Sequence, residues 1–234
     1  MKKILKVFIA LFLLLIVGLV ITAFVLHQKL PIGEGEPKAD VMARRMLKAM
    51  NQDAYRNTRF LEWSYQGGKN NYKWDKAKGI CTVTWENYQV ELRLSAPSKS
   101  TCSVDGVKAP KEKCHELVEY ALKNFNNDSF WLVAPYKVFD KGTKRSIVPL
   151  EDGSEGLLVT YASGGTTPGD SYLWKLNNDG FPKSYHMWVD IIPVGGLEAS
   201  WDDWLVTESG ALLPKSHKLG PITLSMGDVK GYNE

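Results

Sequence analysis

The side chains best suited to catalysis or metal binding are four histidines and the carboxylates near them, and their spacing supports neither role. His186 and Asp190 lie four residues apart on an expected strand, so about 13 Å separates them and they cannot hydrogen-bond directly. A metal site would have to combine this pair with Asp202, Asp203 and His217, whose spacing matches no known ligand pattern. We therefore predict no metal site.

Two further classes of reactive sequence are missing from the chain. The glycine-rich stretch GGTTPG at 164–169 lacks the lysine of a phosphate-binding loop, so we interpret it as an ordinary loop between strands. No G-x-S-x-G motif is present to hold a nucleophilic serine. The sequence therefore favours a protein that is not an enzyme and that uses no cofactor.

The other distinctive residues are aromatic, and they recur on segments with the alternation of β-strands. Trp63, Trp74 and Trp85 are spaced by eleven residues within a region of alternating polar and apolar side chains. Tight turns near Gly68 and Gly79 would place the three indoles in one cross-strand row, Trp63 opposite Trp74 and Trp74 opposite Trp85. An indole has a large apolar body and one N–H donor, so such a row suits a ligand cavity as well as a core.

Residues 126–140, NNDSFWLVAPYKVFD, combine a polar start, an apolar run and a proline. Asp128 or Ser129 is expected to cap a short helix, which Pro135 ends within two turns. Two interpretations stay open. The segment is either a plug that fills the core or a lid over a ligand. The lid interpretation assigns ligand contact to three aromatic residues, Phe130, Trp131 and Tyr136.

These residues must be positioned by a chain in which two helical segments separate groups of strands. Apolar spacing predicts a helix over about 39–52, four or five strands, a second helix over about 110–125, and five or six further strands. We expect an α+β fold that is mainly β. One curved antiparallel sheet would form a half-open barrel with both helices on its concave side, and residues 39–234 would make this single domain.

A run of twenty uncharged residues, 7–26, precedes the expected domain. As a helix it would be about 30 Å long, which matches the hydrocarbon core of a bilayer. Three lysines precede the run and acidic residues follow it, which places the domain on the outer side of the membrane. We predict a membrane anchor over 1–29 and a linker over 30–38; a cleaved signal peptide is the alternative.

Charge and cysteine content narrow the range of partners. The net charge of +3 comes from four lysines in the first 29 residues, because the remaining 25 Lys and Arg oppose 26 Asp and Glu, a balance of −1. A nearly neutral body argues against a nucleic-acid partner. Three cysteines leave at least one unpaired. A disulfide between Cys102 and Cys114 is possible, and three buried thiols are the alternative.

Three stretches carry a resemblance to known proteins: FWLVAPYKVFDKGT, YLWKLNNDGFPKSYHMW and WDDWLVTESG. They resemble a family of bacterial envelope proteins that has no assigned activity, over most of residues 55–232. More distantly, the order of helices and strands with an aromatic interior is similar to the lipoprotein-carrier superfamily typified by LolA and LolB. That resemblance implies a half-open barrel whose helices act as a lid over a cavity for acyl chains.

We therefore expect a single-pass protein of the bacterial inner membrane with its C-terminal domain in the periplasm. Its function would be to bind a lipid, an acylated protein or another apolar ligand in the cavity. The residues expected to line that cavity are aromatic: Trp63, Trp74, Trp85, Phe130, Trp131 and Tyr136. The alternative is a non-catalytic interaction or scaffold module of an envelope complex, with a solidly packed interior.

Overall fold

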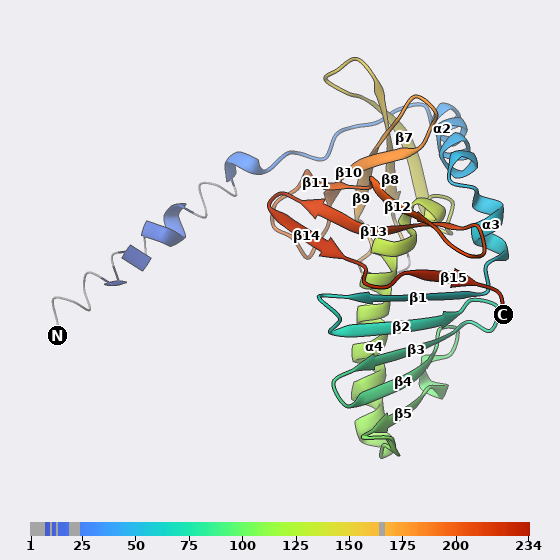
Figure 1. Ribbon diagram of the computed structural model, residues 1–234. Coiled ribbons are helices and arrows are strands. Elements are labelled where there is room, and N and C mark those ends of the chain that lie inside the picture. The colour runs from blue at the N-terminus through green and yellow to red at the C-terminus, as the bar shows by residue number, and fades with distance from the viewer. Residues whose placement is uncertain (1–7, 10, 13, 19–23, 164–166) are drawn as a thin grey trace.

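The strands of this protein are antiparallel and form two sheets, with a few helices packed against them (Figure 1). The computed structural model describes residues 8–9, 11–12, 14–18, 24–163 and 167–234. Within these residues the fold is mainly β, which confirms the class expected from the alternating sequence.

The first sheet has seven strands and is built largely from neighbouring hairpins. In spatial order its strands are β15 (Lys230–Tyr232), β1 (Phe60–Tyr65), β2 (Asn70–Asp75), β3 (Ile80–Trp85), β4 (Tyr88–Arg93), β5 (Thr101–Val104) and β6 (Val107–Lys108). Residues of β1 and β3 alternate between buried and half-buried, as expected for a sheet with one face against the core. The last strand of the chain, β15, pairs with the first.

The second sheet has eight strands, all from the C-terminal half of the chain. Its spatial order is β12 (Asp203–Val206), β13 (Leu212–Leu219), β11 (Leu197–Ser200), β10 (Pro182–Trp188), β9 (Ser171–Leu176), β8 (Glu155–Tyr161) and β7 (Thr143–Pro149), and β14 (Ile222–Ser225) also pairs with β13. Two backbone hydrogen bonds link it to the first sheet: Ser64 N–H to Met226 O (3.0 Å), and Ser209 N–H to Gly231 O (2.9 Å).

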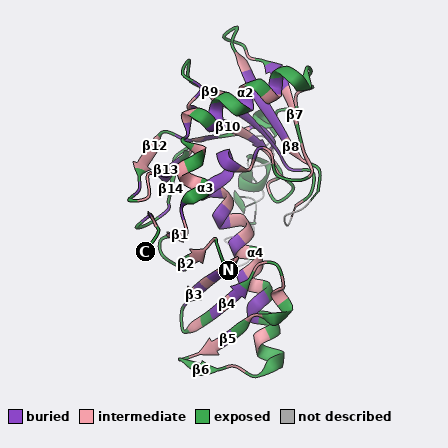
Figure 2. Ribbon diagram, turned by 90° about the vertical axis from the view of Figure 1, so that its right-hand side faces the viewer, coloured by how far each residue is buried: buried purple, intermediate pink, exposed green. Residues whose placement is uncertain are grey.

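The expectation of one continuous curved sheet is therefore wrong. The cause is helix α4 (Lys111–Val133), which is about 35 Å long at 1.5 Å per residue. It runs along the first sheet from the β5 end, and its C-terminal end reaches the second sheet (Figure 1). Strand β7, which follows α4, starts far from β6, and the strands from β7 to β14 form the second sheet (Figure 2). Strand β15 returns to the first sheet and pairs with β1.

The two predicted helices are present with different ends. The helix predicted over 39–52 is α2 (Glu36–Ala49), and the short α3 (Gln52–Asn57) follows it. Asn51 separates them because its φ of 49° lies in the left-handed region. The helix predicted over 110–125 is α4, which continues to Val133, and the 3-10 turn η2 (Ala134–Lys137) follows directly.

One hydrophobic core is shared by both sheets and by the inner faces of α2 and α4 (Figure 2). Leu61 of the first sheet and Leu157 of the second are both fully buried in it. An ion pair between Arg145 of β7 and Asp40 of α2 (2.5 Å) fixes α2 to the second sheet. Both sheets therefore share one interior.

The predicted membrane anchor falls partly outside the described residues, because 1–7, 10, 13 and 19–23 are not among them. The residues that are described between 8 and 26 are helical and exposed. Among the described residues, no helix is long and apolar enough to cross a membrane.

The predicted linker, 30–38, is packed against the second sheet along part of its length. Glu34 and Ile147 of β7 exchange two backbone hydrogen bonds, of 3.0 and 2.8 Å. Gly33 is needed for this approach, because a Cβ built on it would lie 2.2 Å from Ser146 Oγ. Helix α2 already begins at Glu36, so the C-terminal end of the predicted linker belongs to that helix.

Candidate functional site

The three tryptophans of the predicted row lie on one face of the first sheet, the face that α4 covers. Their pairing differs from the prediction: Trp63 is opposite Tyr72, Trp74 opposite Leu61, and Trp85 opposite Tyr88. The cause is loop position, since the loops at residues 66–69 and 76–79 are centred earlier than the expected turns. The predicted face was correct and the predicted register was wrong.

The part of α4 from Tyr120 to Phe125 packs into these indoles with its own aromatic residues. The Phe125 ring lies 5.2 Å from Trp74 and 6.2 Å from Trp63, measured between ring centroids. The Tyr120 ring lies 4.5 Å from Trp85. Trp63 and Trp85 are only 2% and 6% exposed, so α4 fills the space in front of them.

The C-terminal end of α4 makes equivalent contacts with the second sheet. The Phe130 ring lies 4.7 Å from Tyr172 of β9, and the Trp131 ring lies 5.7 Å from Tyr185 of β10. Five of the six residues predicted to line a cavity therefore meet along α4. We call these contacts the α4 aromatic interface. It consists of the α4 residues Tyr120, Phe125, Phe130 and Trp131 and the aromatic residues they touch on the two sheets: Trp63, Trp74, Trp85, Tyr161, Tyr172 and Tyr185.

The sixth predicted residue, Tyr136, lies just beyond this interface, in η2. Its ring stacks on Tyr55 at a centroid distance of 3.9 Å. Its hydroxyl lies within donating distance of two backbone carbonyls, Met50 O (3.0 Å) and Leu212 O (2.7 Å). Tyr136 therefore joins η2 to the end of α2 and to β13.

The expectation that Asp128 or Ser129 caps a short helix is wrong, because both lie inside α4 and are buried. Pro135 does end the α-helix. It has no N–H, so it cannot donate to the carbonyl of Trp131, its partner four residues back. His217 of β13 takes that place, with Nε2 2.8 Å from Trp131 O.

His217 is fully buried and holds a second carbonyl as well. Its Nδ1 lies 2.8 Å from Ser200 O. Burial lowers the pKa of His217, and the two carbonyls act in the opposite direction. A neutral imidazole has one N–H, so it donates to one of these carbonyls at a time. The ring therefore connects the end of α4 to two strands of the second sheet.

Several polar atoms of the α4 aromatic interface have no hydrogen-bond partner among the described residues. They are Trp63 Nε1 and Trp74 Nε1 of the first sheet and Tyr161 Oη of β8, whose ring lies 5.4 Å from Phe130 of α4. Buried donors in folded proteins are normally paired. A ligand with carbonyl or ester oxygens would supply acceptors that the aromatic side chains of α4 lack.

Sequence reasoning missed a buried carboxylate in the same interface. The side chain of Asp128 accepts hydrogen bonds from Tyr72 Oη, Asn70 Nδ2 (3.2 Å) and Asn127 Nδ2 (2.8 Å). No cation is among these partners, and burial raises the pKa of the Asp128 carboxyl. The available signal was spacing, because Asp128 lies three residues from both Phe125 and Trp131, on the buried face of the helix.

Asp128→Asn is expected to remove a pH-dependent contribution to stability. Because the pKa of Asp128 is raised above 3.8, the folded chain binds this proton more tightly than the unfolded chain. The free energy of unfolding of the wild-type chain therefore falls as the pH rises from 3.8 through the raised pKa. Denaturant unfolding over a pH series measures this slope, and an identical slope in D128N would contradict the assignment.

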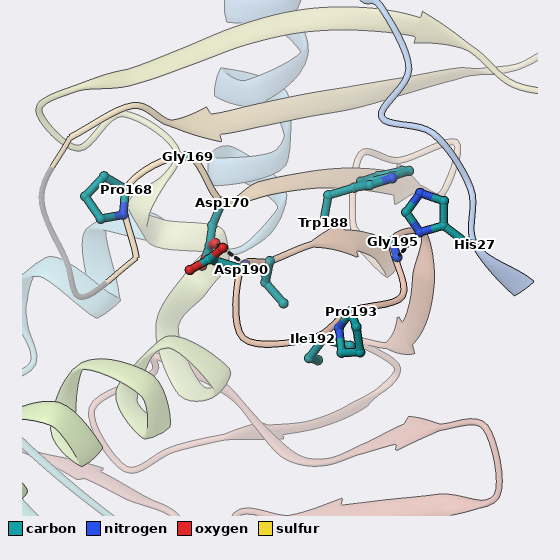
Figure 3. Close-up of a pocket in the computed structure, with 10 residues that line it drawn as sticks. His27, Pro168, Gly169, Asp170, Trp188, Asp190, Ile192, Pro193 and Gly195 are labelled. Carbon is teal, nitrogen blue, oxygen red and sulfur yellow. Dashed lines mark hydrogen bonds between the residues drawn. The ribbon is translucent and has the colours of Figure 1, made fainter. Parts of the chain in front are cut away.

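A surface pocket of ≈ 320 Å³ lies beside the point where the N-terminal segment meets the second sheet (Figure 3). Its wall includes an indole, two carboxylates and the loop after β10: His27, Asp170, Trp188, Asp190, Ile192 and Pro193. Asp170 accepts a hydrogen bond from the Asp190 N–H (3.0 Å), which holds that loop in place. The residues that line this pocket are separate from the α4 aromatic interface.

Among the described residues, the histidines and carboxylates considered as metal ligands do not come together in one site. His186 Nδ1 lies 3.0 Å from Gly196 O. Within the described part of the chain, no group of three or more His, Cys, Asp or Glu side chains is placed to hold a metal ion.

The cysteines adopt the pairing that the sequence left open. Cys102 of β5 and Cys114 of α4 form a disulfide, with a Cα–Cα distance of 5.4 Å. Cys81 of β3 is a free, buried thiol, and burial raises its pKa above the ordinary value. The disulfide attaches the start of α4 to the first sheet.

Comparison with models of known protein families and with curated proteins found no match for this chain. The functional assignment therefore depends on the chain's own geometry. Its most distinctive part is the α4 aromatic interface, which joins both sheets and contains unpaired donors.

Proposed function

We propose that this chain is a membrane-anchored protein of the bacterial envelope that binds a lipid, an acylated protein or another apolar ligand between α4 and the two sheets. In this proposal the anchor is the run 7–26, the domain lies in the periplasm, and the two linked sheets form a half-open barrel around α4. The observation that carries the proposal is the α4 aromatic interface with its unpaired N–H and O–H groups.

An acyl chain that enters this interface exchanges one apolar contact for another. Each buried CH₂ contributes roughly 0.8 kcal/mol, so a long acyl chain supplies on the order of 10 kcal/mol to offset lost contacts of α4. The ester oxygens of a lipid would accept hydrogen bonds from the indole N–H groups of Trp63 or Trp74, which have no hydrogen-bond partner in the described structure.

The ends of α4 restrict where a ligand can enter. The disulfide of Cys114 holds its start to β5, and His217 holds the carbonyl of Trp131 near its end. The middle of the helix, around Phe125, is held by side-chain packing and by the network of Asp128. Ligand entry is therefore expected at the middle of α4.

Photocrosslinking tests this proposal on the full chain in its own membrane. The probe is phosphatidylethanolamine with a diazirine group on one acyl chain, and the labelled peptides are mapped by mass spectrometry. We expect labelled residues in β1, β2 and the middle of α4, in addition to the run 7–26. Labelling inside the domain should decrease when excess unlabelled lipid is added, because a binding site saturates, whereas labelling of 7–26 should not.

Crosslinks confined to the run 7–26, or domain labelling that excess lipid does not reduce, would contradict the ligand proposal. A matched control is Thr82→Ala on the opposite, half-exposed face of β3, which should leave the labelling pattern unchanged. Trp63→Ala, on the α4 side, should reduce it.

A second candidate function is a non-catalytic interaction module of an envelope complex, with no ligand in its interior. The observation that favours it is packing: along the interface, Trp63, Leu132 and Tyr185 are between 0% and 2% exposed. Chemical crosslinking in membranes followed by purification separates the two candidates. A stable protein partner without saturable lipid labelling would support the second candidate.

A further inference from the structure

The first residues after the apolar run are hydrogen-bonded to the hairpin of β10 and β11 (Figure 3). The Gln28 N–H donates to Gly195 O (2.9 Å), and the Gly195 N–H donates to His27 Nδ1 (3.1 Å). The Trp188 indole N–H donates to Gln28 O (2.8 Å). Glycine is required at position 195, because a Cβ there would lie 2.9 Å from Gln28 O and 2.4 Å from the Trp188 ring.

This docking fixes the hairpin close to the end of the apolar run. His27 and Gln28 are the first two residues after the uncharged run 7–26. An extended residue spans at most about 3.6 Å, so the hairpin lies within about 10 Å of the end of the run. In the proposed function, on which this step rests, the run crosses the bilayer and its end lies at the membrane surface.

The loop of this hairpin has the composition of a membrane-surface contact. Residues 189–194 read VDIIPV, with no lysine or arginine. Ile191 is 66% exposed, and Ile192 and Pro193 line the adjacent pocket. Exposed aliphatic side chains beside an indole suit the layer between lipid headgroups and acyl chains. The charge of Asp190 and the lack of cations favour a zwitterionic surface over an anionic one.

We propose that residues 189–194 contact the headgroup layer of the bilayer that holds the anchor, with Ile191 inserted at its boundary with the acyl chains. Together with the docked residues His27 and Gln28, this contact holds the domain in one orientation relative to the membrane. The loop is thus a second attachment, separate from the ligand site along α4.

A single cysteine at position 191 tests the contact in the full chain. Cys81 is fully buried and Cys102 and Cys114 form a disulfide, so Ile191→Cys supplies the accessible thiol for a nitrobenzoxadiazole label. The labelled chain is placed in nanodiscs of phosphatidylcholine and phosphatidylethanolamine. We expect blue-shifted emission and strong quenching by lipids with a spin label near the headgroup.

The matched control is Val107→Cys on β6, which is 70% exposed and lies at the far edge of the first sheet. Its label should emit as in water and resist the lipid quencher. Equal emission and quenching at both positions, in a chain that stays in the membrane after an alkaline carbonate wash, would overturn the loop contact alone. Release of the chain by that wash would overturn both the anchor and the contact.

Discussion

Replacing Trp131 by alanine is expected to lower the free energy of unfolding by about 3–5 kcal/mol, the usual cost of truncating a large buried aromatic side chain. Trp131 is 9% exposed and packs between Tyr185 and His217, at ring-centroid distances of 5.7 and 5.3 Å. Denaturant unfolding of the full chain in mild detergent, followed by near-ultraviolet circular dichroism, measures the change.

The same variant decides between the two interpretations of residues 126–140. If the segment is a plug, Trp131→Ala destabilises the fold as stated. If W131A instead unfolds like the wild-type chain but no longer retains lipid, the segment is a lid and the plug interpretation is wrong. Val107→Ala is the control, since its side chain is 70% exposed and the expected change is within about 0.5 kcal/mol.

The second large loss in the free energy of unfolding is expected when His217 is replaced. His217→Ala removes the one N–H that the neutral ring donates to the carbonyl of Trp131 or of Ser200, at a cost of about 1–3 kcal/mol, and it also creates a cavity. The measurement is again denaturant unfolding. His115→Ala is the matched control, because its side chain is 76% exposed and pairs with Glu119 on the same helix.

The pH dependence of His217 has the opposite sign to that of Asp128. Because burial lowers the pKa of His217, the unfolded chain binds this proton more tightly, and the wild-type chain loses stability as the pH falls below 6.5. Asp128 instead stabilises the fold at low pH. Comparing H217A with D128N over one pH series separates the two contributions. An H217A chain that loses stability in the same window as the wild type would contradict the assignment to His217.

The faces of the strands could be predicted from the sequence, whereas their register could not. Alternation requires only the two-residue period of a strand, so it placed Trp63, Trp74 and Trp85 on the same side. Register depends on where a loop is centred, and the loop at 66–69 is centred earlier than the expected turn. The division into two sheets depends on where α4 ends, and that end was misjudged because Asp128 and Ser129 imitate a helix cap.

The ends of α4 illustrate why part of the candidate site was not predictable. Pro135 predicts that the carbonyl of Trp131 lacks its usual backbone N–H donor, but the sequence does not indicate which distant residue donates in its place. His217 is 86 residues away along the chain. The partners of the buried Asp128 are equally distant in sequence, since Tyr72 and Asn70 lie more than 50 residues before it.

The pairing of β15 with β1 affects how the protein folds during its synthesis. The Tyr232 hydroxyl donates to the Glu62 carboxylate, 170 residues earlier, and Gly231 pairs with Leu61. During synthesis the hairpins from β1 to β6 can form between neighbouring strands, whereas the outer edge of β1 stays unpaired until residues 230–232 have been made. An unpaired edge strand can form backbone hydrogen bonds with strands of other chains. A copy that lacks residues 230–232 would therefore keep an unpaired edge on β1, which favours aggregation or proteolysis.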